Sequence, residues 1–92
     1  MNFEWNIEKN NILKEERGVC FEDVVIAINQ NGLLDVIQHP NQVKYPGQQI
    51  YIIEFNVYVY MVPFIKKEEI IFLKTIIPSR KMNHYIKENC DG

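Results

Sequence analysis

From residue 33 onward the chain carries four runs of β-branched and aromatic residues, and this feature constrains the fold most. Such residues are enriched in β-strands because they pack well on a pleated surface. We expect strands over residues 33–37, 49–55, 57–65 and 69–77. A polar segment with two proline steps separates the first two runs, and a short charged turn connects the last two. Because hairpin-length connections join neighbouring strands, the sheet should be antiparallel.

Three short features leave strand boundaries open. Asn56-Val57 would suit a tight turn, but Val is a poor residue for the positive φ that such a turn requires. Pro63 has no N–H to donate, so it should lie at a sheet edge, a bulge or a strand end. At the start of the chain, residues 3–5 form either a short edge strand or an aromatic plug.

Ahead of the strands the sequence predicts two helices. Asn6 is a suitable N-cap for a first helix over about residues 7–15, and Gly18 suits the turn that follows it. This helix has few apolar residues and should cover a surface. The second helix ends at Asn31-Gly32. Its buried stripe, at i, i+3, i+4 and i+7, consists of Phe21, Val24, Val25 and Ile28.

Ser79 is expected to cap a last helix over about residues 80–88. The stripe that can pack on the sheet consists of Met82, Tyr85 and Ile86. A different stripe consists of Arg80, His84 and Lys87. The pattern predicts an α+β fold with two N-terminal helices, a four-stranded antiparallel sheet and a C-terminal helix. At 92 residues the chain should form a single domain, residues 1–92.

Composition and charge argue against several classes of protein. The longest apolar stretch, residues 57–65, is about half as long as a membrane-spanning helix, and the first ten residues lack a signal-peptide pattern. Cys20 and Cys90 have no metal-binding or redox spacing, so we expect reduced thiols in a cytoplasmic protein, with one disulfide as the alternative. The net charge of −2 gives no general attraction to nucleic acid. Residues 1–35 nevertheless have seven acids and three bases, a balance of −4, whereas residues 36–92 have seven bases and five acids, a balance of +2.

Three motifs lie in order along almost the whole chain. The first is Phe3-Glu4-Trp5-Asn6 followed by Glu8-Lys9-Asn10. The second, at the step into the second helix, is Gly18-Val19-Cys20-Phe21-Glu22-Asp23. The third is Ile76-Ile77-Pro78-Ser79-Arg80-Lys81, with Tyr85 after it. Together they resemble the BrnT family of toxins, although Cys20 and Pro78 stand where that family usually has Ser.

The resemblance implies a RelE-like fold, with helices packed on an antiparallel sheet. It also implies an RNA-cleaving toxin of a type II toxin–antitoxin pair, which cuts through the RNA 2′-hydroxyl without a metal or cofactor. A cognate antitoxin protein would neutralise it by direct binding. The alternative is a catalytically inactive BrnT-like module that binds a protein partner through its acidic first half and an exposed strand edge.

Cleavage through the 2′-hydroxyl needs a base, an acid, and cations that stabilise the charge on the phosphate. Arg80 is the first candidate for the phosphate, because its planar guanidinium can bind two oxygens at once. It would also lie at a helix N-terminus, which favours anions. His84, one turn further, could serve as base or acid, with His39 as the rival. For each of these residues the alternative is an exposed side chain without a catalytic role.

Further cations and aromatic residues could hold the RNA. The candidates for its backbone are Lys74, Lys81, Lys14 and Arg17. Ordinary surface lysines, or partners of the helix dipole in the last two cases, are the alternatives. Tyr58, Tyr60 and Phe72 could stack on unpaired bases, although such residues more often belong to a core. The sequence shows no zinc spacing and no glycine-rich phosphate loop.

Overall fold

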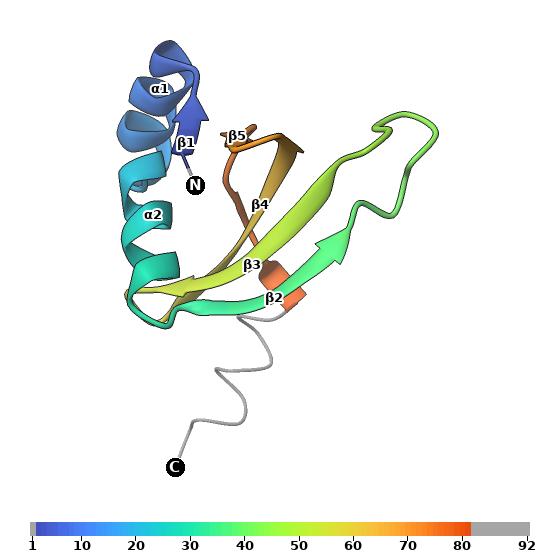
Figure 1. Cartoon of the computed structure of the whole chain (residues 1–92). Coiled ribbons are helices and arrows are strands. Elements are labelled where there is room, and N and C mark those ends of the chain that lie inside the picture. The colour runs from blue at the N-terminus through green and yellow to red at the C-terminus, as the bar shows by residue number, and fades with distance from the viewer. Residues whose placement is uncertain (1, 82–92) are drawn as a thin grey trace.

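The computed structural model describes residues 2–81 and shows two helices and six strands (Figure 1). In chain order these elements are β1 (Asn2–Trp5), α1 (Ile7–Arg17), α2 (Phe21–Asn29), β2 (Leu33–Gln38), β3 (Gln49–Phe55), β4 (Tyr58–Lys67), β5 (Ile70–Leu73) and β6 (Ile77–Pro78). The strands form one sheet in the order β1-β5-β4-β3-β2, and β6 pairs with β4.

The sheet is mixed, so the expected four-stranded antiparallel sheet is wrong. Residues 2–5 form an edge strand, β1, which runs parallel to β5. The aromatic side chains of this strand explain its position, because Phe3 lies opposite Ile71 and Trp5 opposite Leu73 in the register. Both aromatic residues pack against the buried cluster. Residues 6–69, which contain both helices and the strands β2, β3 and β4, form the long connection that a parallel pairing requires.

The last predicted strand, residues 69–77, divides into β5 and β6, which pair with different parts of β4. Pro63 lies between those parts. Its carbonyl accepts a hydrogen bond from the Lys74 N–H at 2.8 Å, so its missing N–H would have pointed to the same side. Because Pro63 cannot donate there, the ladder is interrupted after Leu73.

The expected C-terminal helix over residues 80–88 is not part of the described fold. Arg80 and Lys81 are its two members within the described residues, and 82–88 lie outside them. The described part of the chain is therefore an α+β fold with two helices and a six-stranded mixed sheet.

Both predicted N-terminal helices are present, and their ends follow the capping signals. The Asn6 side chain accepts a hydrogen bond from the Lys9 N–H at 2.9 Å, which caps α1. Gly18 ends α1 with a left-handed φ of 68°, and its N–H donates to the Lys14 carbonyl. At the start of α2, the Asp23 carboxylate accepts from the Cys20 N–H at 3.0 Å.

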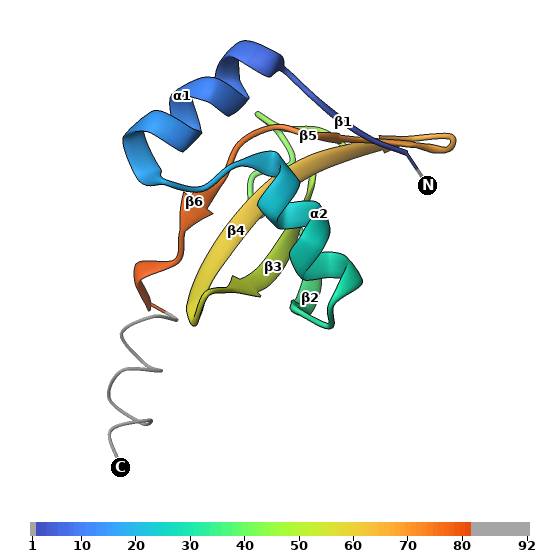
Figure 2. The same ribbon diagram turned by 90° about the vertical axis from the view of Figure 1, so that its left-hand side faces the viewer.

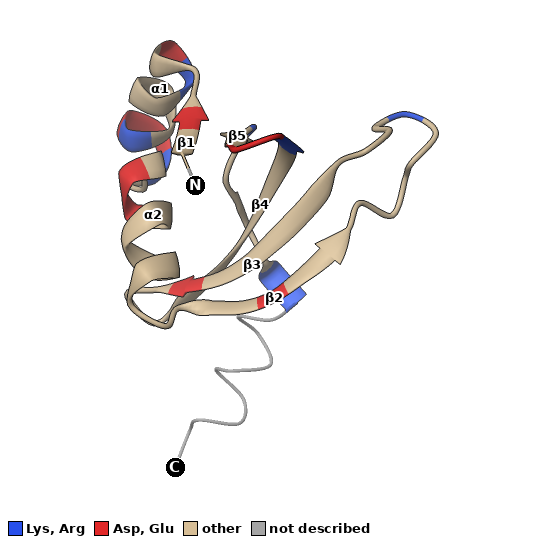
Figure 3. Cartoon of the chain, in the orientation of Figure 1, with Lys and Arg blue, Asp and Glu red and all other residues tan. Residues whose placement is uncertain are grey.

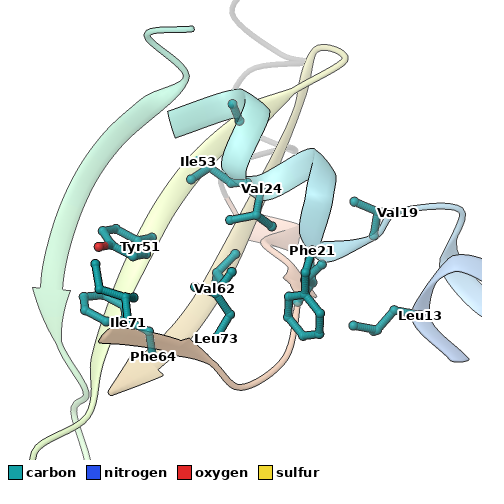
Figure 4. Packing of buried hydrophobic residues seen from close by; sticks show 12 residues of the cluster. Leu13, Val19, Phe21, Val24, Tyr51, Ile53, Val62, Phe64, Ile71 and Leu73 are labelled. Carbon is teal, nitrogen blue, oxygen red and sulfur yellow. The ribbon is translucent and has the colours of Figure 1, made fainter. Parts of the chain in front are cut away.

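The helices cover one face of the sheet, and the core lies between them and the strands (Figures 1, 2 and 4). The helical segment contributes Leu13, Val19, Phe21, Val24 and Ala27, and the strands and the segment before β6 contribute Tyr51, Ile53, Val62, Phe64, Ile71, Leu73 and Ile76. Leu13 is the buried apolar residue of α1. That sparse contribution agrees with the expectation that this helix covers a surface.

A buried amide joins the two helices. Asn10 is 8% exposed, and its Oδ1 accepts from the Phe21 N–H at 2.7 Å. Its Nδ2 donates to a carboxylate oxygen of Glu22, also at 2.7 Å. This hydrogen bond lowers the pKa of Glu22. Asn10 therefore fixes the start of α2 against the middle of α1.

Candidate functional site

The face of the sheet opposite the helices carries the candidate site. On β4, Val62 and Phe64 point into the core, so the alternating residues Met61 and Ile65 point to the other side. We call this side the outer face. The register places Ile77 of β6 opposite Met61 and Phe72 of β5 opposite Ile65.

Two arginines line an open hollow at one end of the outer face. The hollow has a volume of about 530 Å³ and is lined by Arg17, Met61, Ile77, Pro78 and Arg80. We call it the arginine hollow. Its floor is apolar, and both of its charged groups are guanidinium cations. A hollow of this composition suits an anion that accepts several N–H donors.

Arg17 is held in this position by the segment that leads into β6. It is the last residue of α1, and its Nη1 donates a hydrogen bond to the carbonyl of Ile76. Figure 2 shows the end of α1 near this segment. The side chain uses part of its fixed fork on that carbonyl and retains further N–H donors. Arg17, for which interaction with the helix dipole was the alternative, therefore lines the arginine hollow.

Arg80 is exposed and has no hydrogen bond or ion pair within residues 2–81. The backbone just before it is fixed, because Ser79 is buried and its N–H donates to the Val59 carbonyl at 3.0 Å. The position of Arg80 is therefore set by Ser79, and its guanidinium has no partner among residues 2–81. This is the side chain that the sequence favours for phosphate.

The remaining predicted cations do not line the arginine hollow. Lys14 is exposed on α1 and lies close enough to Glu22 to help lower the pKa of that carboxyl. Lys81 is exposed beside Arg80. Lys74 belongs to a second hollow on the outer face. Figure 3 shows red and blue segments on α1 and a red segment at the start of α2.

Of the two histidine candidates, the structure describes His39, and His84 lies outside the described residues. His39 is in the loop between β2 and β3, where its Nδ1 accepts from the Asn41 N–H at 3.0 Å. Its ring contacts that of Tyr45, with the centroids 4.4 Å apart. These contacts give His39 a structural role in the loop.

The aromatic candidates divide between the two sides of the sheet. Tyr60 packs against the core cluster, and burial raises its pKa. The ring of Tyr58 lies 5.3 Å from that of Tyr60. Phe72 lines a hollow of the outer face. We therefore keep Phe72 as the candidate for stacking on a base.

The described residues contain no cluster of three or more His, Cys, Asp or Glu side chains that could hold a metal ion. Cys20 is partly buried, and this burial raises the pKa of its thiol, while Cys90 lies outside residues 2–81. Neither α1 nor α2 is long and apolar enough to cross a membrane.

The sequence matches no protein-family model and no curated protein. The residues lining the arginine hollow can bind a phosphate and stabilise added negative charge. Met61, Ile77 and Pro78 offer no group that can transfer a proton.

Proposed function

We propose that this protein is an RNA-cleaving toxin of a type II toxin–antitoxin pair, and that it binds the scissile phosphate in the arginine hollow. The observation that carries the proposal is that Arg17 and Arg80, 63 positions apart in the sequence, line the same open hollow. Two guanidinium groups on an apolar floor favour a planar or tetrahedral oxyanion over a neutral ligand.

In the proposed reaction the 2′-oxygen of the RNA attacks the adjacent phosphorus and loses its proton to a base. The bond from phosphorus to the 5′-oxygen breaks, and an acid protonates that oxygen. Arg80 binds the non-bridging oxygens in a bidentate manner, and Arg17 adds a second positive charge. We assign one of these two proton transfers, as base or acid, to His84, which follows Arg80 by four positions in the sequence.

A cleavage assay with purified protein, single-stranded RNA and a chelator tests this proposal. Arg80→Ala should lower the cleavage rate about 10²–10³-fold, since it removes a preorganised donor for the transition-state charge. Arg80→Lys should be intermediate, because an ammonium keeps the charge but not the two-oxygen geometry. Lys44→Ala makes the same charge change in the exposed β2–β3 loop and should have no effect.

Growth of expressing cells gives a second measurement. The wild-type chain alone should arrest growth and degrade mRNA, and Arg80→Ala should not. His84→Gln should retain RNA binding but lose cleavage. If folded wild-type protein leaves both RNA and growth intact, the chain is not a ribonuclease toxin.

The second candidate function is a catalytically inactive module that binds a protein. The edge strand β2 favours it, since it pairs on one side with β3 and exposes Leu34, Val36 and Ile37. An exposed apolar edge is a template for a further strand. A cognate antitoxin could use the same edge, with an interface of about 800 Å² per partner. Harmless expression together with tight binding of a protein partner would favour this second function.

A further inference from the structure

We propose that the outer face carries a second RNA subsite, at which a base stacks on Phe72 and its phosphate binds Lys74. This proposal rests on the proposed function and extends it from one phosphate to a track for single-stranded RNA. The subsite is a hollow of about 430 Å³, which we call the lysine hollow. It is lined by Ile65, Lys67, Glu68, Ile70, Phe72 and Lys74.

The two hollows lie on the same face of the same strand. Met61 lines the arginine hollow and Ile65 lines the lysine hollow, and both point to the outer face of β4. Four residues of a strand span about 13 Å. Phosphates of a stacked strand recur every ~3.4 Å, so about four nucleotides cover this distance. A short single strand can therefore reach both hollows at once.

The backbone of Lys74 lies between the two hollows, and its side chain lines the lysine hollow. Its N–H donates to the carbonyl of Pro63, which is midway between Met61 and Ile65 along β4. Its ammonium lies 5.2 Å from the centroid of the Phe72 ring. The interruption that divides β5 from β6 therefore places an exposed cation along the route from one hollow to the other.

The lysine hollow combines the two contacts that unpaired nucleotides use. Its apolar floor includes an aromatic ring that is partly exposed, and bases of any sequence can stack on such a ring. The charged residues that line the hollow are Lys67, Lys74 and Glu68, so its net charge is +1 (two bases minus one acid). An incoming base would take the ring face that Lys74 covers and leave its ammonium for the phosphate. An acidic peptide would use the cations but not the ring.

The test compares binding of two 2′-O-methyl uridine oligonucleotides, which cannot be cleaved through the 2′-position. A dinucleotide can fill the arginine hollow alone, and a hexanucleotide can span both hollows. The hexanucleotide should bind the wild-type chain at least about tenfold more tightly. Phe72→Leu, which keeps an apolar side chain but removes the ring, should weaken hexanucleotide binding about tenfold and leave the dinucleotide unchanged. Lys74→Ala should act in the same direction.

Lys44→Ala is the matched control. Lys44 also lies over an aromatic ring, that of Tyr45 at 5.3 Å, but in the distant β2–β3 loop. Its removal should leave both affinities unchanged, and circular dichroism verifies the fold of each variant.

Three outcomes would overturn a proposal. The subsite alone is overturned if Phe72→Leu and Lys74→Ala leave the hexanucleotide affinity unchanged while Arg80→Ala weakens the binding of both oligonucleotides. If neither oligonucleotide binds, or Arg80→Ala has no effect, the proposed function itself is overturned. Equal competition by a hexa-aspartate peptide would show attraction by charge without stacking, and would also overturn the subsite.

Discussion

Val57 is a β-branched residue in a left-handed backbone conformation. With Asn56 at a φ of 53° and Val57 at 63°, the two residues form the tight connection between β3 and β4. The Val57 side chain is 79% exposed, so it gains little from packing. The sequence predicted a turn at this position but left its boundary open, since propensity alone disfavours Val there. The pairing of the long strands on either side determines the turn in spite of that preference.

Replacing Val57 with Gly should therefore stabilise the protein. A left-handed conformation costs a residue with a Cβ about 1–2 kcal/mol, and the greater entropy of unfolded Gly offsets part of the gain. We expect a net increase of about 0.5–1 kcal/mol in the free energy of unfolding, measured by urea denaturation. Val43→Gly is the control. Val43 is 97% exposed but has no positive φ, so its replacement should bring no gain. A stabilisation of equal size in both variants would contradict this explanation.

At the scale of elements, α1 and α2 are joined by Asn10 as well as by apolar packing. Sequence periodicity could predict α2 and the caps, because these depend on neighbouring residues. It could not predict the role of Asn10, whose partners lie 11 and 12 positions away on the next helix. From the sequence alone, an Asn in the middle of a polar helix is expected to be exposed, and its burial becomes evident only from the position of the second helix.

Asn10→Ala should destabilise the fold by about 1–3 kcal/mol, because the Phe21 N–H loses its acceptor in a buried position. Asn11→Ala, at the exposed neighbouring position, measures the small gain in helix propensity that Ala brings.

The loss of Asn10 should also change how the free energy of unfolding depends on pH. The hydrogen bond from Asn10 lowers the pKa of Glu22 in the folded protein. Its contribution to stability is therefore fully present above the pKa that Glu22 has in the unfolded chain, and it is lost as the pH falls through the lower pKa of the folded protein. The difference between Asn10→Ala and wild type should therefore shrink on acidification. A constant difference would show that Glu22 is not involved.

For the whole molecule, local patterns predicted most of the elements but not the sheet. Hairpin-length connections correctly indicated the antiparallel pairing of β3 with β4. The parallel β1–β5 pair was missed because it joins residues 68 positions apart, a relation that no local period contains. The arginine hollow was missed for the same reason. Arg17 and Arg80 were separate candidates, and only the packing of α1 beside the segment before β6 brings them together.

The charge distribution of the whole molecule leads to a prediction for salt. The net charge of −2 should make RNA binding depend on the few cations of the outer face. If Arg17, Arg80 and Lys74 each contact a phosphate, the logarithm of the hexanucleotide affinity should fall with the logarithm of salt concentration with a slope of about −2. Raising salt from 50 to 200 mM should then weaken binding about sixteenfold. Titrations across this range test it, and a slope near zero would contradict phosphate binding.

The pairing of β1 with β5 has a consequence for synthesis on the ribosome. The first strand to emerge can complete its hydrogen bonds only after residues 70–73 have left the exit tunnel. Likewise, the Arg17 side chain can donate its hydrogen bond to the Ile76 carbonyl only after Ile76 has been synthesised. Nascent chains therefore lack both the β1–β5 pairing and the arginine hollow until the residues that complete them have been synthesised.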